Sequence, residues 1–198
     1  MMFYTNIKNQ GFSLVETLVA ISILLLVVTG PMTISMRTAK STSFATEQVQ
    51  AFFLAQEGLE LAQKGRDDLL LGRFLPSANP SYIANPWSQF SSTTGAFQSC
   101  HNSTGCGLQW SASSPTQLGT VINCSGSCVL YRTNSNVRSR FTYTATSNIL
   151  TPFTRRIYFS NITGGVAIRS EVTWRTGSLV AEQKVTSMTY LYNIYALP

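Results

Sequence analysis

The pattern of apolar and polar positions separates a helical first third of the chain from a strand-rich second half. Between Phe12 and Met36 the one ionisable side chain is Glu16, and nearly all its neighbours are apolar. As an α-helix, this run of roughly 25 residues would measure about 37 Å, more than the roughly 30 Å thickness of a bilayer's hydrocarbon core. The pattern therefore predicts a membrane-spanning helix over residues 12–36.

After this run the pattern becomes one-sided without an obvious stop. Apolar side chains that recur at helical spacings predict one buried stripe: Phe44, Val49, Phe52, Phe53, Leu59 and Ala62. The polar side chains expected to face water or neighbouring subunits are Lys40, Glu47, Gln50, Glu57, Lys64 and Asp68. One helix is thus predicted from Phe12 to about Leu71, with an amphipathic continuation over residues 37–72. Gly30 and Pro31 should weaken it, because proline removes a backbone hydrogen bond.

Beyond Gly72 the helical pattern ends. Residues 73–107 are rich in Ser, Asn, Gly and Pro and are predicted to form a variable loop region, in which the aromatic side chains Trp87, Phe90 and Phe97 pack onto the domain. Strands are predicted in residues 108–198, at 108–112, 119–123, 129–132, 138–146, 153–161, 166–174 and 179–192. Glycine-containing turns separate the last three, which predicts an antiparallel meander. The predicted fold class is α+β: a long N-terminal helix, membrane-spanning in its first half, packed on a C-terminal antiparallel β-sheet domain.

Glu16 is the anomaly of the apolar run. A carboxylate in a bilayer core costs on the order of 2 to 3 kcal/mol and therefore needs a partner. If the chain were cleaved between Gly11 and Phe12, the new α-amine would lie one helical turn from Glu16 and could neutralise it. Residues 1–11 suit such a leader, because they are polar and the apolar run follows the cut, whereas a secretory signal is cut after its apolar run.

The combination of Lys8, Gly11, Phe12, Glu16 and the uninterrupted apolar helix resembles the type IV pilin and type II secretion pseudopilin superfamily. The resemblance covers about the first 30 residues, and the rest matches in general layout. It implies that a prepilin peptidase cleaves after Gly11 and N-methylates Phe12. It also implies that Glu16 neutralises the N-terminal amine of a neighbouring subunit during assembly.

The resemblance further implies the partners and the location of the chain. The partners are other pilins in a homo- or hetero-oligomer, the peptidase, an inner-membrane assembly platform, and membrane lipid before assembly. The precursor would be a single-pass inner-membrane protein with a cytoplasmic N-terminus, and the assembled filament would be extracellular or periplasmic. Charge counting alone does not favour this orientation, since Lys8 precedes the span and Arg37 and Lys40 follow it.

Four cysteines lie in the loop-rich middle of the chain, at Cys100, Cys106, Cys124 and Cys128. An even number in an exported domain predicts two disulfides, and the close spacings favour Cys100 with Cys106 and Cys124 with Cys128, although four cysteines permit three pairings. A zinc site that also uses His101 is the alternative. The irregular spacing and the oxidising compartment disfavour it, so neither a metal nor a cofactor is expected.

Composition argues against catalysis. His101 is the only histidine, and no Asp follows Asp68, so the exported domain has no Ser-His-Asp constellation. Charged residues make up 11% of the chain, and its net charge is +6. The second half is basic, with Glu171 and Glu182 set against eight cations: Arg132, Arg138, Arg140, Arg155, Arg156, Arg169, Arg175 and Lys184.

The sequence therefore favours a non-enzymatic structural subunit, major or minor, of a type IV pilus or related filament. The alternatives are a type II secretion pseudopilin, or a minor pilin that binds DNA during uptake. In the DNA alternative, phosphate contacts would come from Arg138, Arg140, Arg155 and Arg156, and stacking from Tyr131, Phe141, Tyr143, Tyr158 and Trp174. The simpler interpretation, that these arginines solvate a sheet with few charges, is preferred over DNA as a partner.

Overall fold

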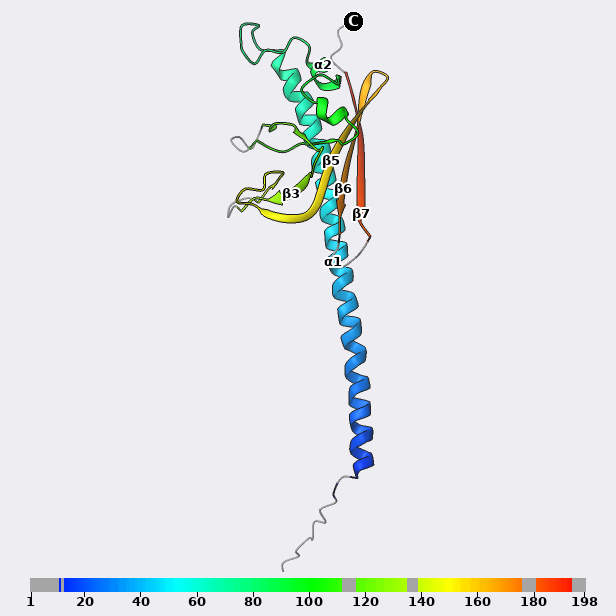
Figure 1. The fold of residues 1–198 in the computed structure, drawn as a ribbon. Coiled ribbons are helices and arrows are strands. Elements are labelled where there is room, and N and C mark those ends of the chain that lie inside the picture. Colours follow the sequence, from blue (N-terminus) through cyan, green and yellow to red (C-terminus); the bar gives the residue numbers. More distant parts are fainter. Residues whose placement is uncertain (1–10, 12, 112–116, 135–138, 176–180, 194–198) are drawn as a thin grey trace, which may run out of the picture. The chain divides into compact units, whose positions relative to one another are not determined.

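The structure is a computed structural model that describes residues 11, 13–111, 117–134, 139–175 and 181–193 (Figure 1). The chain divides into two compact units, Met1–Ala45 and Thr46–Pro198. The fold is α+β, with a long helix and an antiparallel sheet, as the sequence predicts. The first unit contains the first half of helix α1 (Leu14–Gly72), in which every residue from Leu14 to Ser43 is exposed.

The second half of α1 packs on the sheet through small side chains. Its buried residues include Ala51, Ala55, Gly58, Ala62 and Gly65, which recur every three or four positions and therefore share one face of the helix. A Cβ added at Gly58 would collide with the Ser170 side chain on β6. The helix thus approaches the sheet closely at Gly58, which has no side chain, while Leu54, Leu59 and Leu61 are buried beside this point of contact.

This small-residue face corrects the predicted buried stripe. Leu59 and Ala62 are buried, as predicted, but Val49, Phe52 and Phe53 are exposed. The apolar spacing of these larger side chains was misleading, because an aromatic ring at the close approach would push the helix away from the strands. Glu57, which was predicted to face water or neighbouring subunits, instead binds the buried Arg155 side chain.

In the residues that the structure describes, the sheet has seven strands, all paired antiparallel. They are β1 (Cys106–Gly107), β2 (Ile122–Asn123), β3 (Val129–Arg132), β4 (Phe141–Thr142), β5 (Ile149–Ile162), β6 (Gly165–Trp174) and β7 (Gln183–Tyr192). Strand β5 is long enough for β1 and β3 to share one of its edges, while β6 occupies the other and β7 pairs with β6. In Figure 1, β5, β6 and β7 run beside the cyan part of α1.

The three-stranded meander follows its sequence pattern closely. Along β6, residues from Val166 to Trp174 alternate between the buried face and the partly exposed face. Gly164 lies in the β5–β6 turn with φ of 74°, in the left-handed region that glycine adopts without strain. Ser170 interrupts the run of large apolar residues because it lies opposite Gly58, where the helix leaves room for a small side chain.

Three other predicted strands are wrong in extent. The strand predicted over 119–123 shortens to β2. In place of a strand over 108–112, the ladder lies at Cys106–Gly107. In the described residues that follow, which extend to Ser111, Trp110 makes an isolated β-bridge to Leu118. The predicted strand 138–146 shortens to β4, and Arg138 lies outside the described residues. For these last two strands the physical reason is side-chain competition, because Arg155 binds the Leu108 carbonyl and Gln109 binds the Tyr143 amide.

The region after α1 is more ordered than a loop. It contains helix α2 (Pro86–Ser91) and the short 3₁₀ helix η1 (Gln98–His101). These elements bury Phe90 and Phe97, whose rings lie 5.0 and 5.6 Å from the Phe159 ring of β5. The aromatic cluster closes one end of the core. A second cluster, around Leu54, Phe153, Val172 and Trp174, lies along the same sheet.

Candidate processing and assembly site

The predicted processing bond precedes α1. Gly11 is exposed and lies outside the helix, and a Cβ built on it would meet no atom within 4 Å. Phe12, the other residue of the bond, lies outside the described residues. The helix begins at Leu14, and the Thr17 amide donates a 3.1 Å hydrogen bond to the Ser13 carbonyl. On its Gly11 side, the bond is therefore accessible and free of helical structure.

Glu16 lies in the first turn of α1 and is exposed. A carboxylate at a helix N-terminus gains about 0.3 to 1 kcal/mol from the helix dipole. That gain is smaller than the roughly 2 to 3 kcal/mol that its charge costs in an apolar medium. Among the described residues, none of the ion pairs involves Glu16. In apolar surroundings this carboxylate therefore needs a cation from elsewhere.

The rest of the segment suits apolar surroundings. Among the described residues, α1 is the one helix long and apolar enough to cross a membrane, and its apolar window is wholly exposed. Its hydroxyl groups donate to carbonyls of the preceding turn, as in Thr17 to Leu14, Ser22 to Leu18 and Thr33 to Gly30. A hydroxyl satisfied within its own helix costs little to transfer into lipid.

The expected weak point at Gly30 and Pro31 does not interrupt the helix. The α-helix continues through Pro31 to Gly72. The Gly30 carbonyl accepts a 2.8 Å hydrogen bond from the Thr33 hydroxyl. This bond ties the turn around the proline together.

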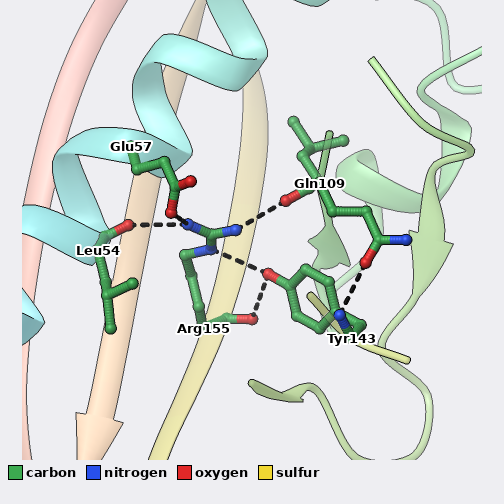
Figure 2. Close-up of polar contacts among 6 residues, drawn as sticks. Leu54, Glu57, Gln109, Tyr143 and Arg155 are labelled. Atoms are coloured by element: carbon green, nitrogen blue, oxygen red, sulfur yellow. Dashed lines mark hydrogen bonds and ion pairs between the residues drawn. The ribbon is translucent and has the colours of Figure 1, made fainter. Parts of the chain in front are cut away.

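A second charged centre lies inside the sheet domain, around Arg155 of β5. The Arg155 side chain is 0% exposed, and its guanidinium donates in several directions (Figure 2). Nη1 binds the Glu57 carboxylate at 2.7 Å and the Leu54 carbonyl at 3.1 Å, both on α1. Nη2 binds the Leu108 carbonyl at 2.8 Å, and Nε binds the Tyr143 hydroxyl at 3.0 Å. We call this group the Arg155 clamp, because it joins α1, β5 and the segments that carry Leu108 and Tyr143.

The clamp keeps its charge despite burial. Burial acts to lower the pKa of Arg155, because the charged guanidinium loses its hydration. Tyr143 and Glu57 oppose this through charge and hydrogen bonding, and the pKa ends above its ordinary value. A buried cation is tolerated when it is paired and its donors are satisfied.

Gln109 completes the polar cluster beside the clamp. Its Oε1 accepts a hydrogen bond from the Tyr143 amide at 2.7 Å (Figure 2). The same oxygen accepts a hydrogen bond from the Thr142 hydroxyl at 2.8 Å. The Tyr143 hydroxyl in turn donates to the Arg155 carbonyl at 3.2 Å. Tyr143 is thus held at both its backbone and its side chain.

The clamp corrects part of the nucleic-acid interpretation. Arg155 was a candidate phosphate contact in the DNA alternative, but its guanidinium is buried and bound, so it is not placed to contact DNA. Arg156 is half-buried and donates to the Thr104 and Gly126 carbonyls. Arg138 lies outside the described residues, and Arg140 is half-buried at the edge of a groove. Of the proposed stacking residues, Trp174 is buried in the core.

The cysteines form the disulfides favoured by their spacing. Cys100 pairs with Cys106 and Cys124 pairs with Cys128, with Cα atoms 4.5 and 5.4 Å apart. A disulfide sulfur has no thiolate to offer zinc, so the zinc alternative loses its ligands. His101 instead packs edge-on against Phe159, and its Nε2 lies 3.3 Å from the Phe90 carbonyl. Among the described residues, no group of side chains is placed to hold a metal ion.

The Arg155 clamp was not predicted from the sequence. Arg155 and Glu57 are 98 positions apart, so no local pattern relates them. One signal was present: Arg155 occupies an inward position between Phe153 and Ile157 in an alternating strand. An arginine at such a position requires an internal carboxylate, and Glu57 follows Leu54 by one helical turn on the side that faces the sheet.

Comparison with known proteins supports the N-terminal interpretation. Residues 6–30 match the family model described as the prokaryotic N-terminal methylation motif. No curated protein and no solved structure matches the chain. The matched residues include Gly11, Glu16 and the start of the apolar helix. The chain therefore carries the N-terminal signature of type IV pilins and pseudopilins, at the start of an apolar helix long enough to cross a membrane.

Proposed function

We propose that the chain is a non-enzymatic structural subunit, major or minor, of a type IV pilus or a related filament. The observation that carries the proposal is the position of Glu16. It lies in the first turn of an exposed apolar helix, five residues after the accessible Gly11, within the matched motif. A carboxylate there has little use in a plain anchor, because it weakens insertion.

In the proposed mechanism, a prepilin peptidase cleaves after Gly11 and methylates the new amine of Phe12. Before assembly, α1 anchors the precursor in the inner membrane with its N-terminus in the cytoplasm. An assembly platform then moves the subunit into the filament. There, Glu16 meets the Phe12 amine of a neighbouring subunit, and the apolar helices bundle in the core.

The sheet domain would form the outer surface of this filament. Its two disulfides suit an oxidising compartment outside the cytoplasm. The Arg155 clamp and the close helix–sheet approach hold the domain to the second half of α1. The domain would therefore move as one body with the helix that is extruded.

Replacement of Glu16 by Leu tests the proposal. In a plain anchor, this change removes an insertion cost of roughly 3 kcal/mol and holds the protein at least as firmly in the membrane. In a filament subunit, it leaves the Phe12 amine unpaired in an apolar core, where loss of one partner costs on the order of 3 to 5 kcal/mol. We expect membrane levels to hold while the sheared-filament fraction falls sharply, with the variant as the only copy.

The control separates assembly from processing. The intact mass of membrane-bound Glu16→Leu must show an N-terminus at Phe12, because an uncleaved precursor would also fail to assemble. Gly11→Val provides the uncleaved reference. Equal filament yields from processed Glu16→Leu and wild type would remove Glu16 from subunit joining.

A further inference from the structure

The Arg155 clamp borders a groove of about 810 Å³ in the sheet domain. One wall is a face of α1 whose lining positions, from Thr46 to Glu57, repeat every three or four residues. The opposite wall carries Trp110 and Ser139 to Phe141. The clamp fixes both walls, since Arg155 binds Leu54 and Glu57 on one side and Leu108 on the other. The groove is therefore preformed.

Among its described lining residues, the groove has a mainly apolar surface and one available cation, Arg140. Val49, Phe53, Leu54, Trp110 and Phe141 line it, and the Phe53 side chain is 65% exposed. Exposed apolar patches of this kind mark contact surfaces in proteins. Glu57 also lines the groove, but Arg155 already neutralises it. Among the described residues, Arg140 makes no ion pair, so it is the groove's uncompensated charge.

The same chain contains a segment with the complementary properties. From Ser13 to Met36, every side chain is exposed, and the one ionisable group is the carboxylate of Glu16. A helix with so much exposed apolar surface needs apolar cover once it leaves lipid. The regular ridge from Thr46 to Glu57 is the kind of surface against which another helix packs. An apolar groove with one free cation thus matches an apolar helix with one free anion.

We propose that this groove binds the apolar α1 segment of a second copy of the chain, with Glu16 of that copy accepting a hydrogen bond from Arg140. The proposal rests on the proposed function, because it names how neighbouring subunits meet. It adds a contact between the helix of one copy and the sheet domain of another. A carboxylate has two acceptor oxygens, so Glu16 can bind Arg140 and still meet the Phe12 amine.

Site-specific photocrosslinking of the full-length chain tests the contact. A benzoylphenylalanine in place of Phe53 is irradiated in assembled filaments, and the products are mapped by mass spectrometry. We expect an adduct of twice the subunit mass that joins position 53 of one copy to residues 13–36 of another. The same probe in place of Tyr192, an exposed residue of β7 outside the groove, should not give this link.

A charge reversal tests the role of Arg140. Arg140→Glu places two carboxylates together, and we expect the filament yield to fall about tenfold or more. The matched control is Arg132→Glu. Arg132 is exposed, lies outside the groove, and pairs with Phe141 across β3 and β4, so it carries the same charge close by. Its reversal should leave the yield within about twofold, and Arg140→Lys should retain most of it.

The outcomes separate this inference from the proposed function. If filaments form normally but position 53 links to lipid, to a foreign peptide or to another part of the chain, the groove has a different occupant and the inference is wrong. If Arg140→Glu assembles like wild type, the charge pairing is wrong. If the unmodified protein forms no filaments, the proposed function itself fails. If the probe at position 53 blocks assembly, benzoylphenylalanine is placed instead at position 141 on the opposite wall. The inference then predicts the same crosslink to residues 13–36 of another copy.

Discussion

Glu16 and Arg155 are charged side chains in apolar surroundings, and they differ in whether the described chain supplies partners for the charge. Arg155 of β5 is fully buried, and its partners all come from its own chain: Leu54 and Glu57 on α1, and the segments that carry Leu108 and Tyr143. Glu16 lies in an exposed apolar helix and, among the described residues, has no ion-pair partner.

The difference shows which part of the molecule satisfies its buried charge with its own residues. The sheet domain satisfies its buried charge internally and adds two disulfides, so it can keep one structure wherever the helix is placed. Within the part of the chain that the structure describes, the apolar half of α1 has no cover, and Glu16 has no ion-pair partner. The sheet domain is stabilised by its own contacts, whereas the apolar helix still needs apolar cover and a cation. Such a chain is suited to assembly with other subunits.

The largest effect on this contrast should come from removal of Arg155. In Arg155→Met, Glu57 and the Tyr143 hydroxyl lose their buried partner, and we expect the free energy of unfolding to fall by about 3 to 5 kcal/mol. Thermal denaturation of the full-length protein in detergent measures it. Arg156→Met is the matched control: its guanidinium binds two carbonyls at a half-exposed position, so a loss near 1 kcal/mol is expected.

A double variant sharpens the same test. Arg155→Met with Glu57→Met removes both charges, and replacement of a whole buried pair by apolar side chains is often nearly neutral. The double variant should therefore be more stable than Arg155→Met alone. If its loss equals the sum of the two single losses, the pair is not coupled and the clamp is not a unit.

The disulfides should have an intermediate effect. Each closes a short loop, with partners 6 and 4 positions apart, for which chain entropy gives a stabilisation of about 2 kcal/mol. Replacement of Cys100 and Cys106 by Ser should lower the melting midpoint of the sheet domain and leave membrane insertion unchanged. An unchanged midpoint would mean that the aromatic cluster around Phe159 holds this region without the bond.

The smallest effect should come from a glycine-to-alanine substitution, made once in the half of α1 that packs on the sheet and once in its apolar half. Gly58→Ala places a methyl group against Ser170, and the overpacking cost of about 1 to 3 kcal/mol exceeds the roughly 1 kcal/mol gained in helix propensity. Gly30→Ala meets no atom within 4 Å. In Gly30→Ala, the melting midpoint of the sheet domain should therefore equal that of the wild-type protein. Equal midpoints for both variants would contradict the close approach of α1 to β6.

The sequence alone determined the features that depend on neighbours in the chain. A long apolar run with one carboxylate five residues after a glycine is a local pattern, and it identified the helix and the motif that the family model matches. Alternation and glycine turns likewise located the three-strand meander. Cysteine spacing favoured the two disulfides for the same reason.

Tertiary structure alone decided which face of α1 is buried and what Arg155 does. Spacing cannot distinguish a stripe of large apolar residues from a stripe of small ones, and close approach to β6 selected the small one, leaving Phe53 exposed. Arg155 looked like a surface cation because its acceptors on α1 lie 98 and 101 positions away. Contacts over such distances form only when the helix docks, and docking turned a candidate DNA ligand into the clamp that holds the domain together.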